Sequence, residues 1–480
     1  MKIALINTPS LFTYGKIKSE NNCSFPLGLG YIASYLKQGD HEVKLFDPEP
    51  YNMSFDYLWK KIKIFEPNLI GITSVTPNFM LAKEIAKTAK INIGCYVVMG
   101  GPHANALSKS TLESCYPNID AVVLGEGEIP MLMIANYFDK HGEIDFGNIP
   151  GVVFYKNDQF IQTLKPDLIK DLDSIPYPAR DLSDMNLYKL HPQFQRGKSA
   201  TILTSRGCPS SCTFCANICM GRKFRANSAQ YVVAEMELLI SNYKINHFHF
   251  VDDNFTANSK RVHEICDLII SKKLNVTWFV FGRVNNLQNN DLIIKMKKAG
   301  CVYVLLGIET GNQEINNLMK KGTTLSMAEK CCELLRKNRI EYFNSYIIGN
   351  EGDTTDTVKE TILFSKKLKS VMAGFNMLIP FPGTEIFNKY YLDYDSPNTN
   401  WNNWCSVGDD LPYEPRHTIL SRKDILKLTS LAYGKFYYNI PQILKIIVFA
   451  KSPKIFISYL KQAFSLILQM LSWFNKSKPK

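Results

Sequence analysis

Short apolar runs alternate with segments of helical periodicity through the first 145 residues. Segments such as Leu29–Lys37 and Asn78–Lys90 place apolar residues three and four apart, the spacing of a helix with one buried face. Strands are expected at Lys2–Asn7, Glu42–Phe46, Leu69–Ser74, Cys95–Met99 and Ala121–Leu124. Five strand–helix units predict an open parallel sheet with helices on both faces, a flavodoxin-like or Rossmann-like domain over residues 1–145.

Small and turn-forming residues follow these strands. In open sheets of this kind ligands bind outside the carboxyl ends of the strands, and glycine there lets the backbone approach a large ligand. The candidates are Thr8, Pro9, Thr73, Ser74, Thr76, Gly100, Gly101, Pro102, His103, Gly125, Glu126 and Gly127. No GxGxxG motif occurs, which disfavours a dinucleotide. Glycine-rich turns and a lone histidine are also common where no ligand binds.

Residues 146–199 connect this domain to the rest of the chain. Gly151–Tyr155 and Phe160–Thr163 flank a polar turn and predict a β-hairpin. The stretch from Asp173 to Arg180 contains two prolines, which favour extended backbone. It is either an ordered bridge between domains or a plain linker.

A second series of strands and helices runs from residue 200 to residue 393. The expected strands are Ala200–Thr204, His247–Val251, Val276–Phe281, Val302–Gly307, Tyr342–Ile348 and Gly374–Ile379. A helical segment follows each of them. Six such units predict a partial (β/α)6 TIM barrel, whose functional residues lie at the carboxyl ends of the strands.

The first of these strands leads into the loop Arg206-Gly207-Cys208-Pro209-Ser210-Ser211-Cys212-Thr213-Phe214-Cys215. Three cysteines at C-x3-C-x2-C spacing suit an iron–sulfur cluster, and three ligands for a four-iron cluster leave one iron open. One alternative is a structural zinc site with Cys219 as fourth ligand. Another is a set of buried structural cysteines. The remaining cysteines of the chain show no ligand-like spacing.

Charged residues and glycines follow the later strands of the predicted barrel. They are Asp252-Asp253, Arg283, Gly307-Ile308-Glu309-Thr310-Gly311 and Pro380–Glu385. Carboxylates can receive an ammonium group, and an arginine suits a carboxylate. Each feature also has a local explanation: Asp252-Asp253 as a helix cap and Glu309–Gly311 as an ordinary turn.

The cysteine loop, with Phe214 directly before the last cysteine, resembles the radical S-adenosylmethionine (SAM) superfamily. With further stretches the chain resembles the cobalamin-binding radical SAM family, which includes the class B radical SAM methyltransferases. Those stretches are Pro26–Ala33, Gly100–Ala104, Gly125–Glu128, Gly307–Gly311 and Pro380–Glu385.

The resemblance implies a 4Fe-4S cluster on Cys208, Cys212 and Cys215, with SAM chelated by the open iron. It implies SAM contacts from Phe214, Asp252, Asp253, Arg283, Gly307, Glu309, Gly311 and Pro382. It also implies that cobalamin contacts Gly28 and the candidate residues named above at the strand ends of the N-terminal domain. No DxHxxG motif is present, so cobalamin is expected base-off with no protein histidine as its lower ligand.

The family's chemistry is reductive cleavage of SAM to a 5′-deoxyadenosyl radical, with the protein supplying position and shelter. In the commonest form an unactivated carbon is then methylated through cobalamin. Cyclisation, ring rearrangement or oxidation with the same cofactors is the alternative. A flavodoxin or ferredoxin is implied as electron donor. A cobalamin- or metal-binding sensor without enzymatic activity would need no SAM site, so Asp252, Glu309 and Gly311 argue against it.

Residues 394–480 are expected to be largely helical with a basic amphipathic end. The net charge of the chain is +12, and residues 425–480 hold nine lysines and no Asp or Glu. Between Ile455 and Phe474 a polar stripe interrupts an apolar helix. Such a helix lies in a membrane interface, packs on the barrel or a partner, or spans a bilayer, although Lys461 argues against a span.

The charge and cysteine patterns also predict the surroundings of the protein. Because the excess charge is local, a general nucleic-acid surface is disfavoured. Scattered cysteines and a strand-like N-terminus predict the cytoplasm, with attachment to the inner face of the membrane as one option. The substrate is expected to be a small molecule, either a lipid or a natural product.

Overall fold

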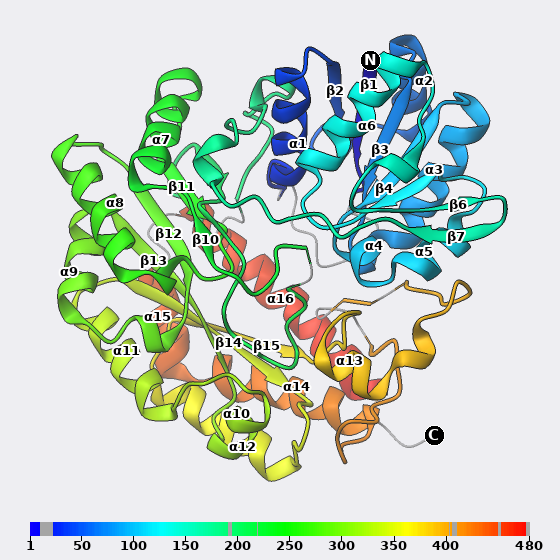
Figure 1. The fold of residues 1–480 in the computed structure, drawn as a ribbon. Coiled ribbons are helices and arrows are strands. Elements are labelled where there is room, and N and C mark those ends of the chain that lie inside the picture. Colours follow the sequence, from blue (N-terminus) through cyan, green and yellow to red (C-terminus); the bar gives the residue numbers. More distant parts are fainter. Residues whose placement is uncertain are drawn as a thin grey trace. The chain divides into compact units, whose positions relative to one another are not determined.

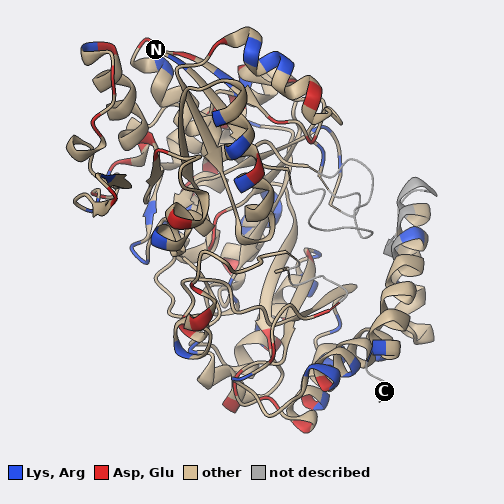
Figure 2. Ribbon diagram, turned by 90° about the vertical axis from the view of Figure 1, so that its right-hand side faces the viewer, with Lys and Arg blue, Asp and Glu red and all other residues tan. Residues whose placement is uncertain are grey.

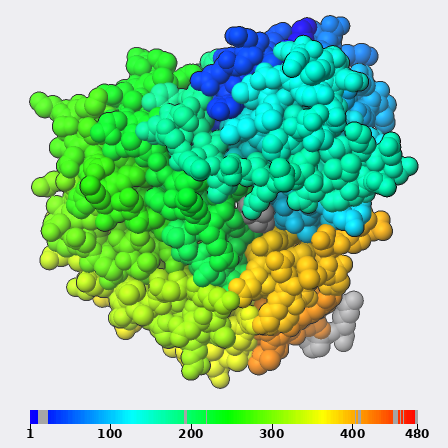
Figure 3. All heavy atoms as spheres, viewed as in Figure 1, coloured from blue at the N-terminus to red at the C-terminus, as the bar shows by residue number. Residues whose placement is uncertain are grey.

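The computed structural model describes residues 1–9, 23–190, 194–217, 219–402, 404–405, 410–449 and 453–476 (Figure 1). The chain packs into two compact units, whose heavy atoms are drawn as spheres in Figure 3. The first contains Met1–Tyr188, Ala216–Arg225 and Phe381–Trp404, and the second contains Lys189–Cys215, Ala226–Pro380 and Cys405–Lys480. Two segments from the region of the predicted barrel therefore pack with the N-terminal residues.

The first unit is built on a seven-stranded sheet with the order β2-β1-β3-β4-β5-β6-β7. Its parallel strands are β1 (Lys2–Asn7), β2 (Glu42–Phe46), β3 (Leu69–Thr73), β4 (Tyr96–Gly100) and β5 (Ala121–Val123). The predicted hairpin, β6 (Val152–Lys156) and β7 (Gln159–Gln162), adds to the sheet in antiparallel sense. The strand order reverses between β1 and β3, the switch point at which such sheets bind ligands.

Helices cover this sheet and bury its apolar strands. They are α1 (Leu27–Gln38), α2 (Phe55–Phe65), α3 (Phe79–Asn92), α4 (Pro102–Ala106), α5 (Ser108–Cys115) and α6 (Glu128–His141). Ile3, Leu5 and Val98 from the strands pack with Leu36 and Ile134 from the helices, and all five are nearly inaccessible to solvent. The predicted flavodoxin-like parallel sheet is confirmed.

The second unit holds a six-stranded parallel sheet whose order follows the chain. Its strands are β8 (Ser199–Ile202), β11 (His247–Phe250), β12 (Thr277–Gly282), β13 (Cys301–Glu309), β14 (Glu341–Ile348) and β15 (Met372–Met377). The helices after them are α7 (Ala229–Tyr243), α8 (Ser259–Ser271), α9 (Asn290–Lys298), α11 (Leu325–Lys337) and α12 (Thr355–Lys367). This is the predicted partial barrel.

Several short elements were not anticipated by the hydrophobic pattern. They are the strands β9 (Ser205–Arg206) and β10 (Arg225–Ala226) and the helix α10 (Gln313–Leu318). α10 begins at an Asn312 side chain that accepts a hydrogen bond from Ile315 N (3.0 Å), a helix cap. Each is too short to show a period in the sequence.

The C-terminal part is helical, as predicted. α14 (Arg422–Tyr437) lies against β15, where Tyr437 Oη donates to Ala373 O (2.6 Å). α15 (Ile440–Phe449) and α16 (Pro453–Lys476) follow. No helix within the described ranges is both long enough and apolar enough to cross a membrane.

Candidate cofactor sites

Asp252, which follows β11, holds the backbone just before the cysteine loop. Its side chain is inaccessible to solvent, and it accepts hydrogen bonds from Thr204 N (2.6 Å), Thr204 Oγ1 (2.5 Å) and Ser205 Oγ (2.8 Å). Burial raises the pKa of Asp252, and the charge of Arg261 opposes that shift. The sequence predicts that Asp252 contacts SAM, but here its oxygens fix the start of the loop.

Arg283, which follows β12, contacts the cysteine loop directly. Its Nη1 donates to Cys212 Sγ at 3.5 Å, and its Nη2 donates to the carbonyl of Lys321. Nearby, Thr213 N donates to Met319 O (3.1 Å). The segment after α10 and the end of β12 therefore hold the loop together, and the guanidinium places a cation beside one of the sulfurs.

Glu309 and Lys321 form a buried ion pair near the loop. Lys321 Nζ lies 2.9 Å from Glu309 Oε1, and their side chains are 4% and 10% exposed. The same ammonium lies 5.9 Å from the centre of the Phe214 ring, within cation–π range. Gly307 leaves room for this pair, because a Cβ there would collide with the Glu309 carboxylate. The sequence predicts Glu309 and Gly307 as SAM contacts but gives no sign of Lys321.

The three cysteines differ in exposure. Cys208 and Cys212 are buried and Cys215 is exposed. The pKa of the Cys215 thiol is raised to about 11, first by desolvation and then by the charges of Cys212, Asp253 and Cys208, while Lys321 lowers it. Binding of iron at a thiol releases its proton, and the nearby charge of Lys321, which lowers the pKa of Cys215, favours that release.

This donor set fits a 4Fe-4S cluster. Three sulfurs on one short loop are the ligands that such a cluster takes, and the cations of Arg283 and Lys321 lie beside them. No three His, Cys, Asp or Glu side chains in the described part of the chain come close enough together to hold one metal ion.

The other predicted SAM contacts lie in different surroundings. Gly311 packs against α12, where a Cβ would lie 2.5 Å from Phe364 Cβ, so the close approach of this helix requires a glycine. Asp253, unlike Asp252, is exposed. Pro382 belongs to the first unit, whereas the others belong to the second.

In the first unit, the predicted cobalamin residues meet at the carboxyl ends of β1, β3 and β4. Thr8 Oγ1 donates to Thr73 O (2.7 Å), and Ser74 N donates to Gly100 O (3.0 Å). Gly101 has a φ of 94°, and a Cβ there would lie 2.5 Å from Ser74 O. Only glycine fits this turn.

The other predicted cobalamin residues lie directly after strands or near the starts of helices. A Cβ built on Gly28, near the start of α1, would meet no atom within 4 Å. Pro9 is buried next to Thr8, and Gly125 N donates to Asn105 Oδ1. Pro102 starts α4 and Gly127 precedes α6. Small residues at the carboxyl ends of the strands and open space at Gly28 suit the approach of a large ligand such as cobalamin.

His103 is packed into the first unit. It is 1% exposed, its ring stacks on Phe79 at 4.0 Å and meets Trp401 edge-on at 5.1 Å, and its Nδ1 lies 3.2 Å from Thr76 Oγ1. Burial lowers the pKa of His103 to about 3. The imidazole is therefore neutral, and through Trp401 it joins segment 381–404 to the sheet. The sequence predicts that His103 and Thr76 contact cobalamin, and the structure shows that the two side chains contact each other.

Glu126, another residue predicted to contact cobalamin, forms a buried ion pair within the first unit. Its carboxylate accepts hydrogen bonds from Arg225 Nη1 (3.0 and 2.8 Å) and from Ile169 N (2.8 Å). Both side chains of this ion pair are 4% exposed. The pair anchors the segment Ala216–Arg225, which directly follows the last cluster cysteine, to the cobalamin-type domain.

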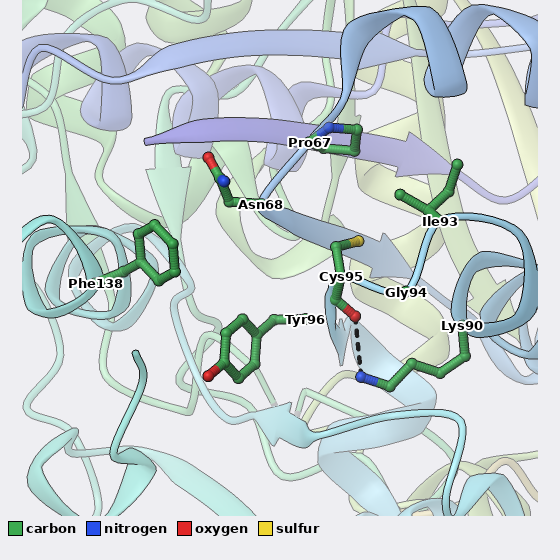
Figure 4. Close-up of a pocket in the computed structure, with 8 residues that line it drawn as sticks. All are labelled: Pro67, Asn68, Lys90, Ile93, Gly94, Cys95, Tyr96 and Phe138. Carbon is green, nitrogen blue, oxygen red and sulfur yellow. Dashed lines mark hydrogen bonds between the residues drawn. The ribbon is translucent and has the colours of Figure 1, made fainter. Parts of the chain in front are cut away.

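A separate pocket opens at the amino-terminal ends of β3 and β4, away from these strand ends (Figure 4). Its lining is Pro67, Asn68, Lys90, Ile93, Gly94, Cys95, Tyr96 and Phe138. Lys90 Nζ donates to Cys95 O (2.9 Å) and to Asp120 Oδ2 (2.7 Å). The charged group of this pocket, Lys90 Nζ, is therefore already paired within the protein.

The Glu126–Arg225 pair predicts the behaviour of the segment after the cysteine loop. Glu126→Ala should leave a buried arginine unpaired and cost about 3–5 kcal/mol of local stability. Tryptic cleavage after the exposed Arg222 or Lys223 should then be at least about tenfold faster. Glu237→Ala, which breaks an exposed pair with Lys272, is the control, and an equal rate in both variants would contradict the anchoring role.

The Glu309–Lys321 pair predicts that substitutions at the neighbouring residues Lys321 and Lys320 have very different effects on stability. Lys321→Met should lower the free energy of unfolding by about 3–5 kcal/mol because it leaves a buried carboxylate unpaired, and it should lower the iron content after reconstitution. Lys320→Met, at an exposed neighbouring position, should change the unfolding free energy by less than about 0.5 kcal/mol. Chemical denaturation and iron analysis measure both effects; similar losses in the two variants would refute the pairing.

Comparison with known proteins covers both units. The chain matches the models of the Radical SAM superfamily over residues 202–365 and of the B12 binding domain over residues 18–135. An uncharacterized methyltransferase of Pyrococcus horikoshii is 32% identical over 446 residues, which is 92% of this chain and 94% of the relative. The anaerobic magnesium-protoporphyrin IX monomethyl ester cyclase of Rubrivivax gelatinosus is 29% identical over 76% of this chain and 66% of its own length.

Two solved structures share the fold. The radical SAM methyltransferase TsrM from Kitasatospora setae, with cobalamin and a 4Fe-4S cluster bound, aligns with a TM-score of 0.66 and 19% identity over 80% of this chain and 73% of its own. The cobalamin-dependent SAM radical enzyme OxsB, with aqua-cobalamin and SAM bound, aligns with a TM-score of 0.73 and 15% identity over 98% and 72%. The chain belongs to the family of radical SAM enzymes that carry a B12-binding domain, and its cofactors are a 4Fe-4S cluster, SAM and cobalamin.

Proposed function

We propose that the protein is a C-methyltransferase that acts on an unactivated carbon of a lipid or natural product. The observation that carries the proposal is the three-cysteine loop, braced by Arg283 and the segment after α10, in a chain that also holds a B12-binding domain. When bound, the cluster would supply the electron that splits SAM to a 5′-deoxyadenosyl radical, and cobalamin would supply the methyl group.

In this proposal Cys208, Cys212 and Cys215 hold the cluster. Arg283 orients Cys212 through its 3.5 Å contact, and Lys321 keeps positive charge beside Phe214 and Cys215. Asp253, the exposed member of its pair, is the better placed carboxylate to receive the SAM ammonium. Asp252 acts through the backbone that it holds, so it is a positioning residue.

Cobalamin would be bound mainly by backbone groups and small side chains. Thr8, Thr73, Ser74 and Gly100 form a tight edge through hydrogen bonds between Thr8 and Thr73 and between Ser74 and Gly100, and Gly28 borders open space. His103 is held by Phe79, Trp401 and Thr76. A lower ligand from the protein is therefore not part of the proposal.

Cyclisation or oxidation with the same cofactors is the second candidate. The likeness to the cyclase of Rubrivivax gelatinosus favours it, although that relative covers less of this chain than the methyltransferase of Pyrococcus horikoshii does. A low-potential protein of the flavodoxin or ferredoxin type would serve as electron donor in either case.

The products of SAM distinguish the two candidates. Anaerobic protein reconstituted with iron, sulfide and cobalamin should convert SAM, in the presence of dithionite and a methyl acceptor, to 5′-deoxyadenosine and S-adenosylhomocysteine together. Methylation uses one SAM for the radical and another for the methyl group, which is why both products are expected. Chromatography with mass detection measures them.

The cysteine variants complete the design. Replacing Cys208, Cys212 and Cys215 by alanine should abolish 5′-deoxyadenosine, whereas Cys95→Ala, in the other unit, should not change it. Deoxyadenosine without S-adenosylhomocysteine would overturn methylation in favour of the second candidate. An unchanged yield of 5′-deoxyadenosine in the triple variant would contradict cleavage of SAM at this loop.

A further inference from the structure

α15 carries an apolar stripe that faces outward. Its members lie three or four residues apart and are between 45% and 81% exposed: Ile440, Ile443, Leu444, Ile447 and Val448. This is the spacing with which a helix normally covers a core. In the described structure no core covers the stripe, and a contiguous exposed stripe of this kind marks an interaction surface.

α16 has two apolar faces, of which only one is packed. Tyr459 joins the buried cluster of Phe279 and Tyr303, and Trp473 stacks on Tyr433 of α14 at 6.0 Å. The second face is exposed, at 39% to 63% of each side chain: Ile457, Leu460, Phe464, Ile467, Leu468 and Leu471. The helix is therefore anchored to the second unit and still presents an apolar stripe to solvent.

The charges carried by the two helices themselves have one sign, although Lys476 at the end of α16 lies 3.7 Å from Asp410 Oδ2. Lys445 on α15 and Lys461 on α16 are exposed, and no Asp or Glu occurs from residue 425 to the end of the sequence. Figure 2 shows α16 at the right-hand edge, marked by blue lysine positions without any red. An apolar stripe flanked by lysines matches the boundary between the headgroups and acyl chains of an anionic membrane.

We propose that the eleven exposed apolar residues on α15 and α16, here called the C-terminal apolar face, dock the protein on an anionic lipid bilayer. The apolar side chains enter the interface while Lys445 and Lys461 contact lipid phosphates. The buried side of α16 stays packed on the barrel and α14, so the helix lies on the membrane rather than crossing it.

A second copy of the chain is a poorer occupant for the same face. A two-fold interface brings the same patch of each subunit together, so the lysines of the two copies would approach one another. Residues 425–480 provide no carboxylate to neutralise them. A bilayer rich in anionic lipid provides negative charge over the whole face.

The test is co-sedimentation of the full-length protein with vesicles of phosphatidylcholine, alone or mixed with phosphatidylglycerol. Wild type should bind the mixed vesicles. The double variants Leu444→Glu/Val448→Glu and Leu460→Glu/Phe464→Glu should each lose at least tenfold in binding, because carboxylates would have to enter the interface. Ile64→Glu on α2 and Leu363→Glu on α12, at similarly exposed apolar positions, are matched controls and should bind as wild type does.

The lysines give an independent readout. Lys445→Gln and Lys461→Gln should each weaken binding to the mixed vesicles about fivefold, and added salt should weaken wild type in the same way. Deoxyadenosine formation in vesicle-free buffer should stay unchanged in all these variants, which separates failure of docking from failure of the proposed reaction.

Absence of wild-type binding to mixed vesicles, or variants that bind as wild type does, would overturn the proposal. So would loss of a dimer by light scattering in the glutamate variants without any vesicle binding, which would assign the face to a second copy.

Discussion

A buried carboxylate must have a partner, and much of the structure around both cofactor sites follows from this constraint. An ionised carboxyl group without compensating charge or hydrogen bonds is expensive to bury. Asp252 has Thr204, Ser205 and the charge of Arg261, and Glu309 has Lys321. In the first unit Glu126 has Arg225. Each pairing ties a strand end to a segment from elsewhere in the chain, and two of them brace the cysteine loop.

These pairings mark the boundary between what the sequence predicts and what it does not. The strands were predictable to within about two residues because alternation of apolar runs and helical segments is a local signal. The cysteine loop was equally local. Arg261, Lys321 and Arg225 carry no motif of their own, and Arg225 is far along the chain from Glu126. Only the fold brings a base to each acid, so the sequence indicates the strand ends and their carboxylates but not the partners that these carboxylates have within the protein.

The sequence also does not show why a glycine stands at a given strand end. A sequence reports that glycine is present but not what occupies the place of its side chain. At Gly307 the space is taken by Glu309, at Gly311 by α12, and at Gly101 by the backbone of Ser74. At Gly28 no atom of the described residues lies within 4 Å of that place. A glycine therefore indicates ligand approach only where the space around it is open, which requires coordinates.

The C-terminal helix shows why the periodicity of the sequence left its location open between a membrane interface, packing on the barrel or a partner, and a membrane span. The polar stripe of α16 separates two apolar faces, and a periodicity measure cannot tell which face the protein covers. Tyr459 and Trp473 are buried on one side, whereas Leu460 and Phe464 are more than half exposed on the other. Packing on the barrel and contact with a partner are therefore compatible uses of a single helix. The packed face fixes the orientation of α16, and a fixed orientation is what allows the exposed face to act as a surface.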